Sequence, residues 1–213
     1  MSGGLLTPII GKQAFRDMLG GGQDVTSDNP LATTPVLGTS PVLNLIYESA
    51  VIDYRLRNIW VEDGYLYLTE ETNKILSVWD VSNPYLPVKK VELDLTPIHS
   101  NAQPLHILKR GDYLYLTLWS ASGIAIIDVS NPLAPTIKSS LLDEPYLYFT
   151  HGEAFLGTDY LVTTGFDGDS VVVINISNPA SPTVTGRITD YNRLDGAHDV
   201  AVVGDYAYVT THY

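Results

Sequence analysis

Three histidines recur near the starts of segments that have strand-like composition. They are His106, His151 and His198. Three neutral imidazoles can ligate a transition metal, and Glu153 or Asp199 could orient a ring from behind. This interpretation predicts a metal site at the three histidines and a divalent metal as the cofactor. The alternative is that each histidine ties its own repeat together by hydrogen bonds, and recurrence in successive repeats favours that structural role.

Aromatic side chains suggest a second kind of site. Trp60, Trp119 and Tyr148 are candidates for a surface that binds a glycan or a protein, although such rings also suit packing between repeats. The segment 166–170 carries an Asp-Gly-Asp that resembles a calcium loop but is first a turn signal. No nucleophile elbow, phosphate loop or zinc-protease motif occurs, so no catalytic residues are predicted.

The elements that position these residues follow from a phrase that occurs three times, Ser-Asn-Pro-x-x-Pro with an Asp or Asn two residues before it. The copies open at Asp80, Asp128 and Asn175, so their spacings are 48 and 47 residues (128 − 80 and 175 − 128). A Tyr-x-Tyr-like strand precedes each copy by 15 residues and occurs a fourth time at Tyr206. A fixed period in this range indicates a repeat architecture.

Each repeat contains four segments rich in β-branched and aromatic residues, separated by turn signals. Four antiparallel strands at this period predict a blade of a β-propeller; a β-sandwich or a solenoid is the alternative. Three complete repeats and half of a fourth are expected, over about 56–95, 104–143, 150–190 and 197–213. The expected strands are 56–62, 65–70, 75–81 and 88–94, then 105–109, 113–118, 123–129 and 136–141, then 152–156, 160–165, 170–176 and 183–189, and finally 198–203 and 206–211.

The remaining residues divide the chain into two parts. Residues 1–42 are rich in Gly and Pro and are expected to form an irregular arm, whereas residues 43–213 form the propeller, beginning with two short strand candidates at 43–47 and 50–54. The half repeat is expected to mean, in order of preference, a fragment of a longer propeller, completion by a partner chain, or four-bladed closure by residues 43–54. The arm is expected to dock on a protein partner.

Composition excludes some classes of partner. The formal charge is −12 and there are no cysteines, so nucleic acid and anionic membranes are unsuitable and disulfides are excluded. Neither a signal peptide nor a membrane span is expected at the start or within the chain. An acidic, cysteine-free chain of this kind favours an extracellular surface or a virion as its location.

The repeat resembles the LVIVD repeat family of β-propellers. The features that carry the resemblance are Gly-Asp-Tyr-x-Tyr at 111–115 and 204–208, each leading into an apolar strand, and the three Ser-Asn-Pro phrases. The resemblance covers about residues 56–213 and implies a propeller facing the cell exterior, but no reaction. The predicted function is therefore a non-enzymatic interaction module within a larger assembly, binding a protein, a glycan or a surface receptor, with a metal-binding or enzymatic propeller as the alternative.

Overall fold

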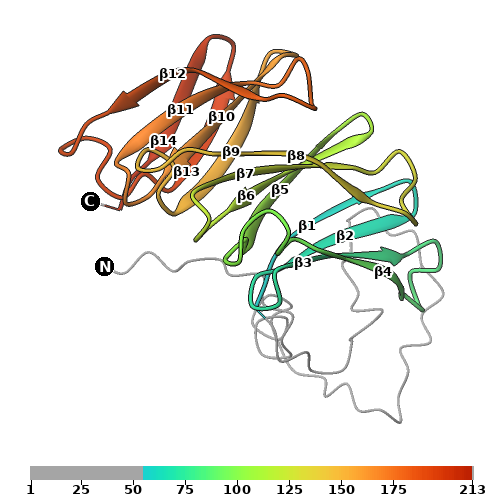
Figure 1. The fold of residues 1–213 in the computed structure, drawn as a ribbon. Coiled ribbons are helices and arrows are strands. Elements are labelled where there is room, and N and C mark those ends of the chain that lie inside the picture. The colour runs from blue at the N-terminus through green and yellow to red at the C-terminus, as the bar shows by residue number, and fades with distance from the viewer. Residues whose placement is uncertain (1–54, 213) are drawn as a thin grey trace, which may run out of the picture.

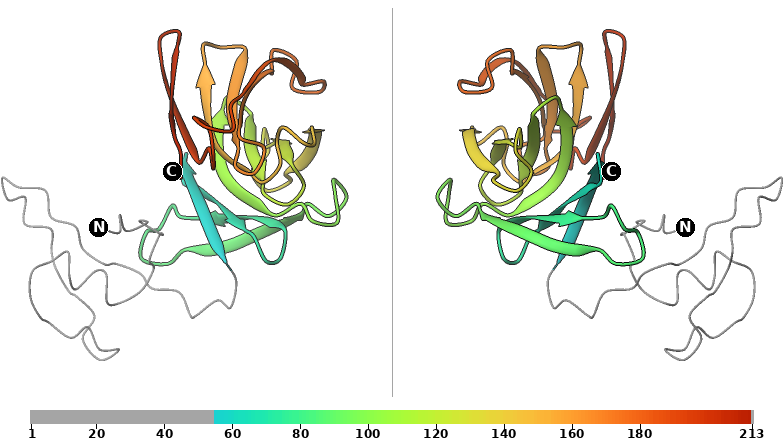
Figure 2. Two further views of the ribbon diagram at one scale, coloured as in Figure 1. Left: turned by 90° about the vertical axis from the view of Figure 1, so that its left-hand side faces the viewer. Right: turned by 90° about the vertical axis from the view of Figure 1, so that its right-hand side faces the viewer.

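The computed structural model describes residues 55–212, and this part of the chain is entirely β. It contains three four-stranded antiparallel sheets and a two-stranded hairpin, which follow one another in chain order (Figures 1 and 2). The strands are Leu56–Glu62 (β1), Tyr65–Glu70 (β2), Ile75–Asp80 (β3), Val88–Asp94 (β4), Pro104–Arg110 (β5), Tyr113–Leu118 (β6), Gly123–Asp128 (β7), Thr136–Leu142 (β8), Thr150–Leu156 (β9), Tyr160–Gly165 (β10), Ser170–Asn175 (β11), Thr183–Thr189 (β12), Asp199–Val203 (β13) and Tyr206–Thr210 (β14).

Each sheet is a simple meander, in which every strand pairs with the next one along the chain. The predicted architecture is confirmed: three propeller blades and half of a fourth form an arc, with the first strands β1, β5, β9 and β13 in contact from blade to blade. The arm at residues 1–42 and the strand candidates at 43–47 and 50–54 lie outside the described residues. Within the described part, no helix is long and apolar enough to cross a membrane.

The repeated phrase ends the third strand of each blade by a specific turn. The carboxylate of Asp80 accepts hydrogen bonds from the amide and the hydroxyl of Ser82, at 3.0 and 2.6 Å. Asp128 and Asn175 hold Ser130 and Ser177 in the same way. These bonds give the serine amide an acceptor after the strand ladder has ended, and the proline two residues later has no N–H with which to continue the ladder, so the phrase recurs where a strand must stop.

The core lies between neighbouring blades. Tyr67 of β2 and Ile107 of β5 are 2% and 3% exposed and belong to one buried cluster, which joins the first two blades. Tyr115 joins the second blade to the third, and Val162 packs with Val200 across the next boundary. Because each blade buries one face on its neighbour, the stack of blades is the unit of stability rather than any single sheet.

Candidate functional site

The first strands of the three complete blades are irregular near their starts. Their pairing with the second strand shifts register at residues 57–58, 105–106 and 151–152, where two residues face one. A β-bulge of this kind re-aims side chains and bends the strand. The same device thus sets the direction of side chains at one end of every complete blade.

A threonine of the second strand holds each bulge. The hydroxyl oxygens of Thr69, Thr117 and Thr164 accept hydrogen bonds from the backbone amides of Asn58, His106 and Gly152, respectively, each at 2.9 Å. In the hairpin Thr210 accepts the amide of Asp199 at 3.1 Å in the same way.

Two of these threonines also reach the next blade. Thr69 donates its hydroxyl to the carbonyl of Leu105 at 3.1 Å, and Thr164 donates to that of His198 at 3.0 Å. The second-strand threonines therefore carry both the bulge and part of the contact between blades.

This register separates the three histidines. His106 occupies the second position of its bulge, and its own amide bonds to the second-strand threonine. His151 occupies the first position, and the amide that bonds to the threonine is that of the next residue, Gly152. His198 matches His151, because the bonded amide is again that of the next residue, Asp199. Within residues 55–212, no side-chain hydrogen bond ties any of the three rings to its own blade, and Nδ1 of His151 is buried without a partner. The side-chain hydrogen bonds at the bulges come from the threonines, and a structural role for the histidines stays a prediction.

The three imidazoles nevertheless converge. The ring centroids of His151 and His198 are 3.9 Å apart, and those of His106 and His151 are 6.4 Å apart. Trp119, which follows β6, lies edge-on to His151 at 4.7 Å, and Phe166, which follows β10, lies 5.6 Å from it. Imidazole and aromatic rings from three blades therefore form one cluster, which we call the axial ring cluster.

Two further residues extend this cluster. Phe149 stacks on Trp119 with centroids 4.6 Å apart and planes inclined by 23°, and the ring of His212 lies 5.6 Å from Phe166. Such stacked and edge-to-face pairs are favourable beyond the area they bury. Phe149, Phe166 and His212 were not predicted as site residues. A signal for Phe166 exists in the sequence, since it follows the second strand of its blade at the same offset as Trp119.

The environment of the cluster favours the neutral form of His106, His151 and His198. Burial lowers the pKa of His106, of His151 and of His198. For His151 the pKa falls to about 3, because burial is reinforced by repulsion from His198, His106, Arg57 and His212. The carboxylate of Asp199 opposes the fall of the pKa at His106 and at His198. Neutral imidazoles can accept a hydrogen bond or ligate a metal.

The metal site stays a prediction. The histidines are neutral and close, which suits a metal, but within the described residues no group of three or more His, Cys, Asp or Glu side chains is arranged to hold a metal ion.

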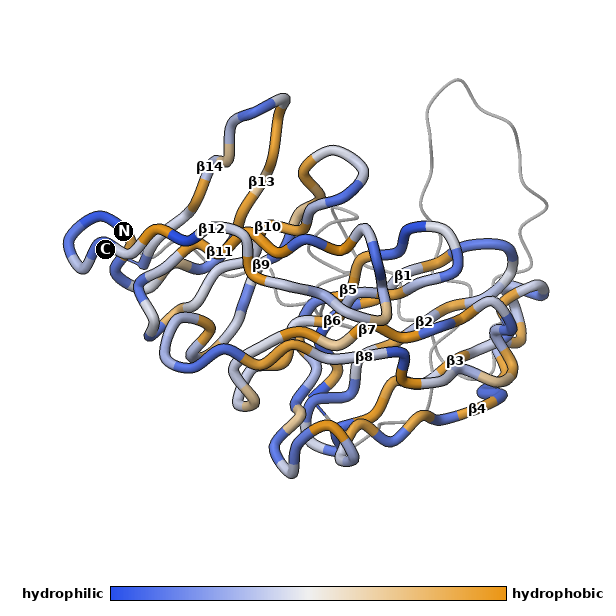
Figure 3. The backbone as a smooth tube through the Cα atoms, turned by 45° about the horizontal axis from the view of Figure 1, so that its top comes forward, coloured by the Kyte–Doolittle hydropathy of each residue, from blue (hydrophilic) through white to orange (hydrophobic). Residues whose placement is uncertain are grey.

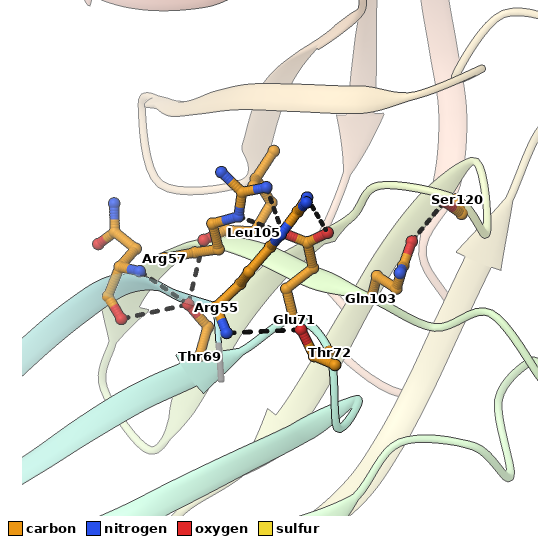
Figure 4. A network of polar contacts seen from close by, with 9 residues as sticks. Arg55, Arg57, Thr69, Glu71, Thr72, Gln103, Leu105 and Ser120 are labelled. Atoms are coloured by element: carbon orange, nitrogen blue, oxygen red, sulfur yellow. Dashed lines mark hydrogen bonds and ion pairs between the residues drawn. The ribbon is translucent and has the colours of Figure 1, made fainter. Parts of the chain in front are cut away.

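The first blade has charged groups where the others have rings. Glu71 follows β2 as Trp119 follows β6, and its carboxylate pairs with Arg57 and, at 3.6 Å, with Arg55 (Figure 4).

In the third blade Glu153 stands where Ile107 stands in the second, and both of its carboxyl oxygens are buried without a hydrogen-bond partner of normal geometry. Burial raises the pKa of Glu153 well above its usual range, and the backbone amide of Leu108 opposes this only in part.

An open pocket of about 650 Å³ adjoins the axial ring cluster between the third blade and the hairpin. Its lining consists of aromatic, acidic and histidine side chains and one glycine: Tyr148, Phe166, Asp167, Asp169, Asp195, Gly196 and His212. Gly196 has a φ of +61°, and a Cβ there would lie 2.7 Å from Cβ of His212, so the close approach requires glycine. None of the three aspartates forms an ion pair with a lysine or arginine of the described residues, although Asp169 accepts the Gly196 amide at 3.2 Å. We call this pocket the acidic pocket.

The fold brings two of the predicted binding aromatics together, since Trp119 and Tyr148 both lie against Phe149, with ring centroids 4.6 and 4.5 Å away, and it sets Trp60 apart. Trp119 lies in the axial ring cluster, and Tyr148 is 40% exposed at the acidic pocket. Trp60, in contrast, packs against the core cluster of the first two blades. The Asp-Gly-Asp segment forms the turn between β10 and β11 and supplies Asp167 and Asp169 to the acidic pocket.

Comparison with known proteins identifies the repeat. The family model of the LVIVD repeat matches residues 56–94, 106–143, 165–190 and 196–212. No curated protein sequence matches the chain.

Among solved structures, a 6-phosphogluconolactonase-like protein from Bacteroides fragilis is similar at a TM-score of 0.62 and 10% identity, over 74% of this chain and 48% of that one. Virginiamycin B lyase from Staphylococcus aureus, in a catalytically inactive form with quinupristin, is similar at a TM-score of 0.54 and 14% identity, over 70% of this chain and 45% of that one. The computationally designed Ika4 protein is similar at a TM-score of 0.60 and 8% identity, over 80% of this chain and 94% of that one. These likenesses show the propeller fold, and this chain spans about half the length of the two natural structures.

Proposed function

The chain belongs to the LVIVD repeat family, and from this premise we propose that it is a non-enzymatic binding module whose ligand site is the acidic pocket together with the axial ring cluster. Both features lie at the blade end where β5 and β9 begin and where β6 and β10 end. Loops at one end of a propeller are a common place for binding because the blades below hold them rigidly. The site is thus built from several blades rather than from one local motif.

The observation that carries this proposal is the composition of the acidic pocket. Asp167, Asp169 and Asp195 surround a space that also presents the rings of Phe166 and Tyr148. Carboxylates attract a cation by charge, and aromatic faces attract it through their quadrupole. We infer that the ligand carries an ammonium or guanidinium group, such as a lysine or arginine side chain of a protein partner.

The charge of the whole chain supports a protein partner with a basic segment over a neutral glycan. A formal charge of −12 would steer a basic segment toward this surface, and this steering weakens as salt is added. A glycan would instead stack on Trp119 and Tyr148 and would gain hydrogen bonds, but no attraction between opposite charges, from the three carboxylates. The two ligand classes therefore differ in their expected response to salt and to loss of the aspartates.

Calorimetric titration of the full chain with an arginine-containing peptide, and with the same peptide carrying citrulline, tests the proposal. Citrulline keeps the shape of arginine and removes its charge. We expect binding of the arginine peptide only, weakened about two- to fivefold by Asp195→Asn, since an exposed ion pair contributes up to about 1 kcal/mol. The matched control is Asp63→Asn, which makes the same charge change in the turn between β1 and β2, a position of positive φ that asparagine tolerates.

Equal binding of the two peptides, or equal weakening by both aspartate variants, would show that charge at the acidic pocket does not select the ligand. Binding of β-linked oligosaccharides that survives high salt and is lost in Trp119→Ala would favour the glycan instead.

A metal-binding or enzymatic role is the second candidate, because the ring of His151 lies 6.4 Å from that of His106 and 3.9 Å from that of His198, centroid to centroid. Titration of the chain with zinc against a chromophoric chelator tests it. Uptake of one zinc that His151→Ala abolishes and His99→Ala preserves would support this role, since His99 is exposed outside the cluster. The docking of residues 1–42 on a protein and the location at a cell surface or virion also stay predictions.

A further inference from the structure

A series of three aromatic rings leads from the axial ring cluster to the acidic pocket. The ring centroid of Phe149 lies 4.6 Å from that of Trp119 and 4.5 Å from that of Tyr148. The strongly hydrophobic stretches of the chain lie mainly on the strands (Figure 3), whereas these three rings belong to the loops that flank β6 and β9. Tyr148 ends the series, since it lines the acidic pocket and is 40% exposed.

The backbone holds this series in a strained conformation. Phe149 has a φ of +52°, a left-handed conformation that bulky residues rarely adopt. Its carbonyl accepts a hydrogen bond from the amide of Phe166 at 3.1 Å. The carbonyl of Tyr148 accepts one from the amide of Asp167 at 3.2 Å. Strain that the surrounding structure keeps in place is typical of pre-organised binding sites.

Two glycines let the loop 143–149 lie directly on the turn between β10 and β11. A Cβ at Gly165 or at Gly168 would collide with the carbonyl oxygen of Tyr146, and the hydroxyl of Ser170 donates a hydrogen bond to the same oxygen. Only glycine allows this close approach. The loop that carries Tyr148 and the turn that carries the aspartates of the acidic pocket therefore form one rigid unit.

The same loop already receives a guanidinium from within the chain. Cζ of Arg187 lies 4.0 Å from the ring centroid of Tyr146, two residues before Tyr148. Nη1 of Arg187 also lies 3.6 Å from the carboxylate of Asp143. An aromatic face and an oxygen acceptor thus hold one arginine side chain together.

A second arginine is held in the same way. Cζ of Arg110 lies 3.7 Å from the ring centroid of Phe155, and its Nη1 donates a hydrogen bond to the carbonyl of Thr158 at 2.7 Å. The ammonium groups of two lysines stay farther from the rings that they face, at 5.2 and 5.9 Å from the centroids, Lys89 over Trp79 and Lys138 over Tyr113. Rings of this fold therefore take guanidinium groups at closer range than ammonium groups.

We infer that the acidic pocket selects a guanidinium over an ammonium group, with Tyr148 as the residue that makes the selection and Phe149 as the residue that positions it. The inference rests on the proposed function, because it specifies which basic group is bound. A guanidinium is planar, so it can lie flat on the ring of Tyr148 while its N–H groups reach the carboxylates of Asp167 and Asp169. An ammonium group is compact and strongly hydrated, so it gains less from the ring. The ligand is thus a protein segment that presents an arginine.

Calorimetric titration of the full chain with three peptides that differ only in one residue, arginine, lysine or citrulline, tests the inference. We expect the arginine peptide to bind the wild type about three- to tenfold more tightly than the lysine peptide, because only the guanidinium stacks on the ring. Tyr148→Leu should weaken the arginine peptide alone and bring the two affinities within about twofold. Tyr148→Phe should keep the preference, since it keeps the ring. The matched control is Tyr85→Leu, because Tyr85 is 62% exposed in the turn after β3.

Two variants of Phe149 test the positioning role. Asparagine and histidine both tolerate a left-handed backbone, but only histidine keeps a ring on which Tyr148 can pack. Phe149→Asn should therefore lower the preference for arginine while the lysine peptide binds as before, and Phe149→His should retain the preference. Equal weakening of both peptides in Phe149→Asn would overturn the positioning role.

The wild type alone separates the two proposals. Arginine and lysine peptides that bind equally, both more tightly than the citrulline peptide, would overturn the selection of guanidinium and leave the proposed function standing. Equal binding of all three peptides would overturn both. A preference for arginine that survives in Tyr148→Leu, with the variant shown to be folded by circular dichroism, would overturn the role of Tyr148.

Discussion

Lowering the pH from 7 to 5 should destabilise the protein through His151. The pKa of this residue falls from 6.5 to about 3 in the folded chain, because burial and the neighbouring positive groups disfavour the charged ring. A group whose folded pKa is depressed contributes stability that is present above its unfolded pKa and is lost as the pH falls. The loss should therefore begin near pH 6.5 and continue toward pH 3.

The magnitude follows from the two pKa values. At pH 5 about 97% of the unfolded chains carry a proton on His151, whereas almost none of the folded chains do, and this difference costs about 2 kcal/mol of the free energy of unfolding. The ring is only partly buried, so solvent screens part of the effect and about 1–2 kcal/mol is expected. His106 and His198, whose pKa values are also lowered, act in the same direction.

The assay is urea denaturation at pH 7 and pH 5, followed by tryptophan fluorescence. In His151→Gln the free energy of unfolding should lose about 1–2 kcal/mol less than in the wild type between these pH values, because the titrating group is gone. His99→Gln should behave as the wild type, since His99 is exposed outside the cluster. An identical pH dependence in His151→Gln and the wild type would refute the reasoning, because it would mean that the folded environment does not resist protonation of His151.

Three further perturbations test how the blades are joined. Thr164→Val removes the hydroxyl that accepts the Gly152 amide and bonds the next blade, and it should cost about 1–3 kcal/mol in thermal or urea unfolding while Thr164→Ser costs much less. Gly152→Ala places a Cβ 2.6 Å from Cα of Asp199 and should lower the free energy of unfolding by about 1–3 kcal/mol. Gly186→Ala is the control, since no atom lies within 4 Å of the added Cβ, and it should have little effect. Equal effects of the two variants would show that β13 is free to move away. Because its pKa is raised, Glu153 stabilises the fold below pH 4.5 and loses this contribution as the pH rises. In unfolding measured at pH 8, Glu153→Gln should therefore be more stable than the wild type. A less stable variant would contradict the view that Glu153 is buried without a partner for its charge.

Much of the fold was predictable because the signals are local and repeated. The phrase with Asp or Asn two residues before Ser-Asn-Pro ends a strand by bonds within five residues, so its three copies locate β3, β7 and β11 in the sequence alone. The alternating Tyr-x-Tyr segments give the second strands in the same way. Convergence of the histidines was also predictable, because the first strands of neighbouring blades lie side by side.

The rest of the site depends on contacts that no local pattern encodes. The bulges place His106 one position away from His151 and His198. For His198 the sequence shows this, because His106 precedes Tyr113 by seven residues and His198 precedes Tyr206 by eight across the same Gly-Asp turn, whereas the longer turn between β9 and β10 hides it for His151. Similarly, the sequence predicts Glu153 only as a polar residue of a strand, and its burial follows from the packing of the second blade against it.

The proposed ligand site can be examined directly by nuclear magnetic resonance of the labelled full chain, titrated with the arginine peptide. The account predicts that amide shifts move at Phe166, Gly168 and Gly196, around the acidic pocket, and not at Asp63 and Gly64 in the turn at the other end of the first blade. Shifts confined to other surfaces, or no shifts at millimolar peptide, would contradict the claim that this end of the propeller binds a basic ligand.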